Sequence, residues 1–244
     1  MRGAANATVP GYGFFEANAC ADGLSLTGRG QPPLSPLVQR IAEEGLEPLR
    51  QRLLADPPQL PLVPRRGDYD LNPRTQRPKA RELAPAAVLI PIVRRATPTV
   101  LFTRRTTHLA RHAGQVSFPG GRLDENDPSL VETALRETRE ETGIGPNFIS
   151  VAGFLDAYET GTGFAILPVV GLLTEGFSLV PDPQEVAEIF EVPLAFLLDV
   201  ANCERQTGEW QGATREFYSF RYERHHIWGV TASIVVNLRE RLCQ

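Results

Sequence analysis

The stretch GGRLDENDPSLVETALRETREETGI, from Gly120 to Ile144, decides the fold of this chain. Asp127 is suited to cap a helix and Pro128 to occupy its first turn, where a backbone N–H has no intrahelical partner. Gly143 suits the end of the same helix, since glycine readily adopts the left-handed conformation found there. The stretch therefore predicts a helix over about residues 128–142.

Three glutamates lie on one side of this helix. Each residue advances roughly 100° around the axis, so with the first helical leucine at zero the apolar stripe runs to roughly 140°. Glu137, Glu140 and Glu141 then fall at roughly 340°, 280° and 20°, on the border of that stripe. Carboxylates gathered there repel one another, and Mg²⁺ or Mn²⁺ would relieve the repulsion because these ions prefer oxygen ligands. The alternative is an ordinary solvated acidic face, in which Arg136 pairs with Glu132.

The helix resembles the Nudix box, G-x5-E-x7-R-E-U-x-E-E-x-G-U, in which U is a bulky apolar residue. The second half of the box is matched by Arg136, Glu137, Glu140, Glu141, Gly143 and Ile144. Thr138 stands where the box has an apolar residue, and one inserted residue is needed to bring Gly121 and Asp127 to the first glycine and first acidic positions. The chain thus resembles the Nudix hydrolase superfamily.

The sequence just before the helix resembles one branch of this superfamily. LFTRRTTHLARHAGQVSFPGG, from Leu101 to Gly121, is similar to LLTxR[SA]x3Rx3Gx3FPGG, which precedes the box in coenzyme A pyrophosphatases. Phe102, Thr106 and Ala110 depart from that pattern, and Arg111 lies one residue beyond the expected arginine. The stretches 185–199 and 227–235 also resemble that branch, so the resemblance covers about residues 84–244 and not the residues before them.

The resemblance implies hydrolysis of the pyrophosphate bond of coenzyme A to 3′,5′-ADP and 4′-phosphopantetheine. Divalent metal ions neutralise the phosphate oxygens and activate water in such reactions. We assign Glu137 and Glu141 as the main ligands of Mg²⁺ or Mn²⁺, Glu140 as a further ligand, and a carbonyl of the Gly121 turn as the group that completes the shell. By the resemblance, Arg136 orients one of the glutamates.

The sequence leaves several alternatives for the general base and suggests a group of residues for substrate binding. Water activated at the metal, Glu185 and Glu188 are the open alternatives for the base. Guanidinium groups bind phosphate in a bidentate way, so we expect substrate binding from a set of loop residues, Arg104, Arg105, Arg111 and His112. Phe118 is expected to stack on adenine or to line the channel for the pantetheine arm, unless it belongs to the core.

Strands and helices alternate irregularly after residue 84. Apolar runs predict strands over 86–93, 99–104, 149–158, 164–173 and 185–192, and another over 216–221. A short helix is expected over 193–200 and an amphipathic helix over 230–242, with the pair His225-His226 and Trp228 packed around its start. The pattern predicts an α/β fold, a Nudix-like α/β/α sandwich on a mixed β-sheet.

The remaining residues, 1–83, form an N-terminal extension of the expected hydrolase domain, 84–244. Residues 1–33 predict a loosely ordered arm, and apolar spacing predicts two short helices, about 36–44 and 47–55. Residues 56–81 are rich in proline and arginine, which favours a linker or an extended strap. The short helices pack on the domain or form a contact between two copies of the chain, so a homodimer is one expectation.

Composition excludes several classes. The 244 residues carry a net charge of −4, which disfavours nucleic acid as a partner. The three cysteines are far apart, so neither a zinc site nor a disulfide framework is expected. No apolar run is long enough to cross a bilayer and no signal peptide is evident, so the expectation is a cytoplasmic enzyme acting on a small nucleotide.

Two other functions remain open from the sequence. A Nudix hydrolase of another nucleotide, such as ADP-ribose or NADH, would use the same carboxylates. A non-catalytic nucleotide-binding sensor is the alternative from a different class, but such proteins typically lose box carboxylates, and here Glu137, Glu140 and Glu141 are all present.

Overall fold

The computed structural model describes residues 36–45, 47–73, 82–108, 112–210 and 212–243. At its centre two ten-residue strands, β2 (Ala84–Val93) and β8 (Phe164–Leu173), run parallel and pair along their whole length. The strand β3 (Thr99–Arg105) is antiparallel to β2 and to β9 (Val186–Pro193). The sheet is therefore mixed, as the sequence predicted.

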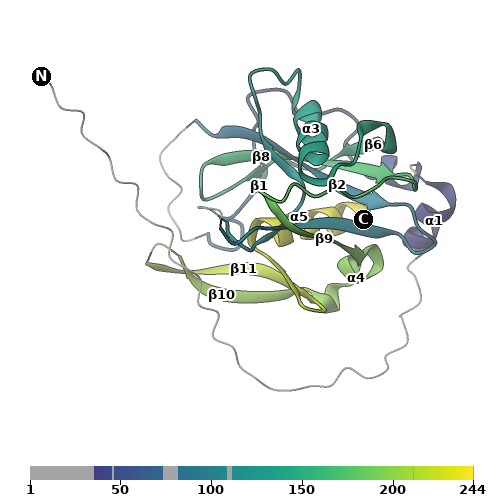
Figure 1. Ribbon diagram of the computed structural model, residues 1–244. Helices are drawn as coiled ribbons and strands as arrows, with labels where there is room; N and C mark the ends of the chain where they lie inside the picture. The colour runs from purple at the N-terminus through teal and green to yellow at the C-terminus, as the bar shows by residue number, and fades with distance from the viewer. Residues whose placement is uncertain (1–35, 46, 74–81, 109–111, 211, 244) are drawn as a thin grey trace, which may run out of the picture.

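Shorter strands complete this sheet and form a second one. The main sheet also contains β1 (Arg66–Gly67), β4 (Val116–Ser117), β5 (Gly120–Arg122), β6 (Ile149–Phe154) and β7 (Tyr158–Glu159). The second sheet is an antiparallel meander of β10 (Glu204–Trp210), β11 (Ala213–Tyr222) and β12 (His225–Trp228). Figure 1 shows the β10–β11 hairpin extending along one side of the domain.

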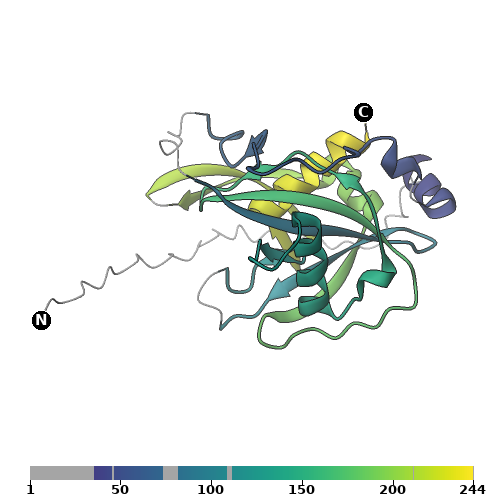
Figure 2. The same ribbon diagram turned by 90° about the horizontal axis from the view of Figure 1, so that it is seen from above.

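Alternation along β2 assigns the two faces of the main sheet. Ile90 and Ile92 pack in the core that contains helix α5 (Gly229–Leu242), whereas Leu89 packs in a second core against helix α3 (Leu130–Thr142). Successive side chains of a strand point to opposite faces, so one strand serves both cores. Figures 1 and 2 show α3 and α5 on opposite sides of the sheet. The predicted α/β/α sandwich is confirmed.

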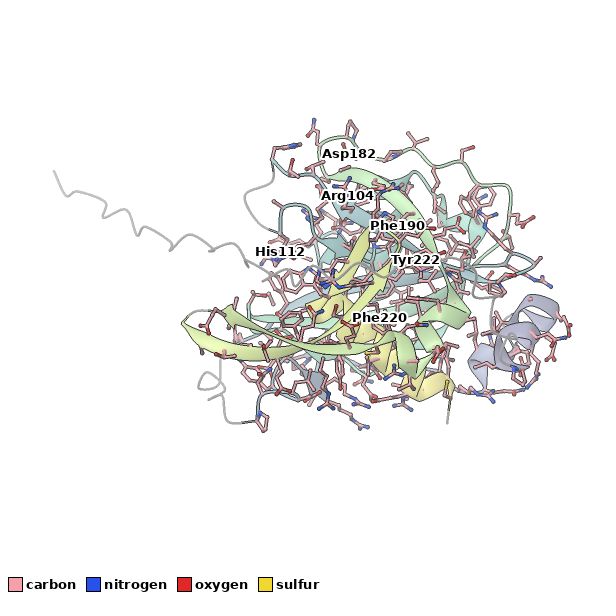
Figure 3. All side chains as sticks on the ribbon, turned by 90° about the horizontal axis from the view of Figure 1, so that it is seen from below. Arg104, His112, Asp182, Phe190, Phe220 and Tyr222 are labelled. Atoms are coloured by element: carbon pink, nitrogen blue, oxygen red, sulfur yellow. The ribbon has the colours of Figure 1, made fainter. Side chains whose placement is uncertain are left out.

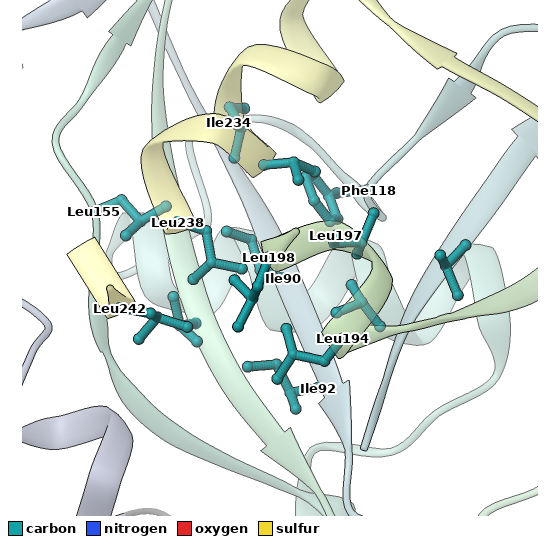
Figure 4. Packing of buried hydrophobic residues seen from close by; sticks show 14 of the residues in the cluster. Ile90, Ile92, Phe118, Leu155, Leu194, Leu197, Leu198, Ile234, Leu238 and Leu242 are labelled. Atoms are coloured by element: carbon teal, nitrogen blue, oxygen red, sulfur yellow. The ribbon is translucent and has the colours of Figure 1, made fainter. Parts of the chain in front are cut away.

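The core on the α5 face is the larger of the two. Figure 4 shows Ile90 and Ile92 surrounded by leucines of α5 and of the short helix α4 (Leu194–Leu198). Leu194, Leu197 and Leu238 are each fully buried. Burial of one such side chain contributes roughly 1.5–3 kcal/mol, so this layer is a main source of stability.

The N-terminal extension packs on the domain. Its helices α1 (Pro36–Glu44) and α2 (Glu47–Arg50) bring Val38, Ile41 and Leu49 into the core of the α5 face, where all three are 0% exposed. Part of the expected strap pairs as β1 with β7. Of the two arrangements open from the sequence, packing on the domain is therefore the one observed, while the arm expected over 1–33 lies outside the described residues.

Several local predictions need correction. The second helix ends at Arg50 instead of near residue 55. The stretch 105–121, in which no strand was predicted, contains β4 and β5, and the strand predicted over 149–158 is interrupted between β6 and β7. His225 and Trp228 form β12 rather than only packing around the start of α5, and the pairing of β10 with β11 was missed. None of the helices in the described ranges has the length and apolar character needed to span a membrane.

Candidate active site

Helix α3 begins two residues later than the sequence suggested. Ser129, not Asp127, is its N-cap, and the Ser129 side chain accepts a hydrogen bond from the backbone N–H of Glu132. The helix ends at Gly143, which has a φ of 77° as predicted. Thr138 is buried and donates its hydroxyl hydrogen to the Ala134 carbonyl, which explains how a polar residue fits at an apolar position of the box.

The glutamates of α3 do not all face the same surroundings. Glu141 is only 4% exposed and lies within the buried stripe rather than on its border. The side chain of Glu137 is 20% exposed, whereas that of Glu140 is 51% exposed. The convergence expected of all three carboxylates is therefore not observed: two turn inward, and the third faces solvent because its position falls outside the buried arc.

Glu137 lies directly behind the glycine turn that precedes α3. A Cβ atom on Gly121 would overlap the Glu137 carboxylate, and a Cβ atom on Gly120 would overlap the backbone of β2. Gly120 also has a φ of 155°, which disfavours other residues. Both glycines are required for this close approach, which places the Gly121 backbone beside the carboxylate as expected for the metal site.

Arg136 links three acidic side chains. Its guanidinium donates to both oxygens of Asp127 at 2.9 Å, to Glu137 Oε1 at 2.9 Å and to Glu140 Oε2 at 3.0 Å. The expected alternative pair with Glu132 is absent from the described contacts of Arg136. Asp127 thus acts as an anchor for Arg136 instead of capping the helix, and the hydrogen bond from Arg136 holds the pKa of Asp127 well below its usual range.

Glu141 is the most perturbed acid of the site. Burial raises the pKa of its carboxyl to about 8, against the opposing effect of Arg105, whose Nη1 lies 3.8 Å from Glu141 Oε1. The other oxygen, Oε2, is buried and has no hydrogen-bond partner. Burial also raises the pKa of Glu137, and the hydrogen bond from Arg136 partly offsets that effect. Ionised carboxylates in this setting need a compensating cation.

The oxygen atoms around Glu137 and Glu141 meet some, but not all, of the requirements of a divalent metal site. Among the described residues, no three Asp, Glu, His or Cys side chains are arranged to share one ion, because Glu140 turns outward and Arg136 lies on Glu137. The unpartnered Oε2 of Glu141 and the close approach of Gly121 to Glu137 nevertheless leave oxygen atoms available for such an ion. Hard oxygen ligands of this kind suit Mg²⁺ and Mn²⁺.

Arg104 and Arg105, expected to act together, contact different carboxylates, at the point where the register of β3 with β9 shifts. Arg105 reaches Glu141 and also Glu185, with Nη2 at 3.6 Å from Glu185 Oε2. Arg104 Nε instead donates to Glu188 Oε2 at 3.0 Å, in a second hollow that also contains His225. Figure 3 shows Arg104 near Phe190 of the neighbouring strand. The expectation that Arg104 joins the substrate contacts of Arg105 is therefore not met.

The other residues expected to contact substrate lie in different surroundings. His112, which Figure 3 labels, hydrogen-bonds Gln115 at 2.8 Å and lines the large cavity described below. Phe118 also lines this cavity, but it is only 3% exposed and its ring stacks on Phe102 with centroids 4.8 Å apart. Phe118 is therefore a core residue rather than an open stacking surface. Arg111 lies outside the described residues.

A cavity of about 480 Å³ lies on the α5 face of the sheet. Gly120, Gly121 and Arg105 form the part of its wall that adjoins the glutamates of α3. The apolar part of the wall includes Val88 and Ile166 of the two central strands. The glycine backbone and Arg105 therefore adjoin both the acidic cluster and a space large enough for a nucleotide-sized ligand.

The opposite wall of the cavity was not predicted from the sequence. It is formed by residues 66–72 of the extension, by the β10–β11 hairpin and by α5, which contribute Asp68, Trp210, Arg215 and Asn237. The turn around Gly212, flanked by alternating polar and aromatic residues, was the sequence signal for that hairpin. No local pattern could have placed residues 66–72 at the cavity, because their neighbours there are distant in sequence.

A helix of carboxylates beside a glycine turn, on a mixed sheet with helices on both faces, is compatible with the class of hydrolases that act on phosphate compounds. Comparison with known proteins agrees with this class. The model of the NUDIX domain matches residues 83–217. "Uncharacterized Nudix hydrolase NudL" of Photorhabdus laumondii is 43% identical over 157 residues, which are 64% of this chain and 84% of that protein. The protein of the same name in Yersinia enterocolitica is also 43% identical, over 80% of its length.

The chain belongs to the Nudix hydrolase family, and its general activity is hydrolysis of the pyrophosphate of a nucleoside diphosphate derivative. Solved structures with similar folds include a MutT/nudix family protein from Enterococcus faecalis, with 17% identity, a TM-score of 0.44, and coverage of 70% of this chain and 66% of that one. The NUDIX domain of Shewanella oneidensis NrtR complexed with ADP ribose has 23% identity and a TM-score of 0.39, covering 54% of this chain and 84% of that one.

Proposed function

We propose that the substrate is coenzyme A or an acyl-coenzyme A, hydrolysed to 3′,5′-ADP and 4′-phosphopantetheine by a cytoplasmic enzyme with Mg²⁺ or Mn²⁺. The observation that carries this proposal is the position of Arg105, which belongs to the sequence signature of coenzyme A pyrophosphatases. Arg105 contacts Glu141 and Glu185 and also lines the large cavity. Arg105 thus provides a positive charge between the carboxylates and the cavity.

We assign the metal-binding role to Glu137 and Glu141, with the backbone of Gly121 beside them. Glu140, whose side chain is 51% exposed, is assigned as a further ligand that acts through a bound water. When bound, the divalent ion neutralises phosphate charge and lowers the pKa of water. Arg136 holds Glu137 through a direct hydrogen bond and is itself held by Asp127. The carboxylate of Glu137 is thereby fixed in orientation before any ligand enters.

Arg105 is suited to bind a phosphate oxygen, because its guanidinium lies at the cavity wall and contacts the carboxylates only at 3.6–3.8 Å. Glu185 remains the candidate general base, since its side chain is 47% exposed and can exchange a proton with solvent. Glu188 is unsuited to that role. Burial would raise its pKa, but hydrogen bonds from His225, Arg104 and Arg224 together lower it to about 2.

A substrate panel tests the proposal. Coenzyme A, acetyl-coenzyme A, ADP-ribose and NADH are compared at equal concentrations with Mg²⁺ and with Mn²⁺, and kcat/KM is measured for each. The proposal predicts the highest kcat/KM for a coenzyme A species. Preference for ADP-ribose or NADH would contradict the substrate assignment, and absence of turnover on all four would favour the non-catalytic sensor.

A further inference from the structure

Three segments meet at the cavity wall that faces away from α3. They are the strap, defined here as Arg66–Asn72, the β7–β8 turn around Gly161, and the β10–β11 hairpin. The Asn72 side chain binds the backbone of Glu216 on the hairpin twice, donating to its carbonyl at 3.0 Å and accepting from its N–H at 2.9 Å. A Cβ on Gly161 would lie 3.0 Å from the Trp210 ring. The hairpin is thus held against the strap and the turn.

Arg215 lies at the centre of this junction. Its guanidinium carbon is 4.9 Å from the centre of the Trp210 ring and 6.0 Å from that of Tyr69, so aromatic rings of the hairpin and the strap hold it. Its Nε atom is buried and has no hydrogen-bond partner. Within the described residues, no carboxylate oxygen lies within the 4.0 Å of an ion pair with Arg215.

Two acids that also line the cavity are engaged by other groups. Asp68, whose carboxylate interacts with Arg215 at longer range, accepts the Tyr158 hydroxyl at 2.8 Å and the Gly161 N–H at 2.6 Å. Glu240 pairs with Arg66 at 2.6 Å. A fixed guanidinium with an unused donor therefore lines the cavity, where Asp68 and Glu240 already have other partners. This is the arrangement expected of an anion-binding residue.

Arg104 and Arg105 differ from Arg215 in having carboxylates within ion-pair distance, although the Nε atom of Arg105 is also buried without a hydrogen-bond partner. Glu188 already neutralises Arg104, and Arg105 lies between Glu141 and Glu185. Arg104 does not line the large cavity, whereas Arg215 does. Of these three arginines, Arg215 is therefore the one whose charge is not paired with a carboxylate. It is available to bind a ligand group remote from the acidic cluster.

We propose that Arg215, held between Trp210 and Tyr69, binds a phosphate monoester of the substrate that is separate from the pyrophosphate being cleaved. In coenzyme A this group is the 3′-phosphate, and in this respect the inference rests on the proposed function. Planar guanidinium groups bind phosphate oxygens with two parallel hydrogen bonds, and loss of a charged hydrogen bond of this kind costs roughly 10- to 100-fold in affinity. The strap would then contribute to substrate selection although it lies outside the matched NUDIX region.

A binding experiment tests this inference without turnover. Isothermal titration compares 3′,5′-ADP with AMP, which lacks only the 3′-phosphate, on the full chain. We expect the wild type to bind 3′,5′-ADP more tightly, Arg215→Gln to lose roughly tenfold or more of that preference, and Arg215→Lys to retain part of it. Arg205→Gln is the matched control, because Arg205 lies on the same hairpin over the Tyr218 ring, at 5.8 Å, but does not line the cavity.

The outcomes separate this inference from the proposed function. Equal binding of the two ligands by the wild type, or the same preference in Arg215→Gln as in Arg205→Gln, would overturn it. Kinetics supply the second readout: Arg215→Gln should lower kcat/KM for coenzyme A about tenfold more than for 3′-dephospho-coenzyme A, mainly through KM. If no substrate is cleaved, the proposed function fails while the titration still decides the role of Arg215. Thermal melting of each variant shows whether it is folded.

Discussion

Glu141 is expected to lower the stability of the metal-free protein, so Glu141→Gln should stabilise it. The carboxyl has a pKa of about 8 in the folded chain because it is buried, against 4.5 as its ordinary value. Because folding raises the pKa of this acid, its contribution to the free energy of unfolding is fully present below pH 4.5. That contribution is lost as the pH rises toward 8. At 1.36 kcal/mol per pH unit, the loss reaches about 3 kcal/mol at pH 7.

Urea unfolding in the presence of EDTA, followed between pH 5 and pH 7.5, measures this effect. The free energy of unfolding of Glu141→Gln should exceed that of the wild type by an amount that grows by about 2–3 kcal/mol over this range. Glu140→Gln is the control, because Glu140 is on the same helix but its side chain is 51% exposed. That variant should show little pH-dependent difference from the wild type.

Mg²⁺ should reverse the order of stability. With Glu141 proposed as a metal ligand, the ion should bind the folded wild type and stabilise it by mass action, whereas Glu141→Gln should lack one ligand and gain less stability. Pyrophosphohydrolase activity should fall at least 100-fold in the same variant, measured as kcat/KM. A stability difference between wild type and Glu141→Gln that is the same at pH 5 and pH 7.5 would refute the burial of an acid with a raised pKa.

Three further changes probe the surroundings of the site. Ser129→Ala should lower the free energy of unfolding by about 1 kcal/mol, because α3 loses its N-cap; urea unfolding measures this, and an unchanged midpoint would contradict it. Gly121→Ala should lower kcat/KM at least tenfold, because its methyl group would displace the Glu137 carboxylate, and wild-type kcat/KM would contradict this contact. Glu188 has its pKa lowered to about 2, so its stabilising effect is present above pH 4.5 and lost as the pH falls below it. Glu188→Gln should therefore cost about 1 kcal/mol at pH 7 and less at pH 3, and equal costs at both would contradict the interaction with His225.

The parts of the fold that could be predicted are those with a local periodic pattern. The strand over 164–173 was predicted with its observed bounds, because a continuous apolar run is typical of a central strand that is buried on both faces. The end of α3 at Gly143 was also predicted, since glycine is the usual residue for a left-handed C-terminal position. Both features depend on neighbours in sequence alone.

The errors concern interactions that join distant residues. Asp127 looked like a helix cap because its type and position suit one, but the guanidinium of Arg136, nine residues later, engages both of its oxygens. Arg104 and Arg105 were grouped because they are adjacent, but they lie against different acidic residues, at a shift in the register between β3 and β9. The burial of Glu141 depends on how α3 packs on the sheet, which an angular plot of one helix cannot show.

The N-terminal extension illustrates the same limit at a larger scale. Its division from the hydrolase domain at residue 83 stays a proposal, while Val38 and Ile41 pack within the main core and Tyr69 packs on Arg215. Proline-rich sequence indicates extended backbone but does not identify the surface on which that backbone lies. The strap could therefore be predicted as a segment and not as a wall of the cavity.

Phosphorus NMR of coenzyme A incubated with the protein and Mg²⁺ tests the central claim most directly. The two pyrophosphate resonances should disappear as the phosphate monoesters of 3′,5′-ADP and 4′-phosphopantetheine appear, and this change should be absent with EDTA or with Glu141→Gln. Persistence of the pyrophosphate resonances in the wild-type sample, or their loss at an equal rate in the Glu141→Gln sample, would contradict metal-dependent cleavage at these carboxylates.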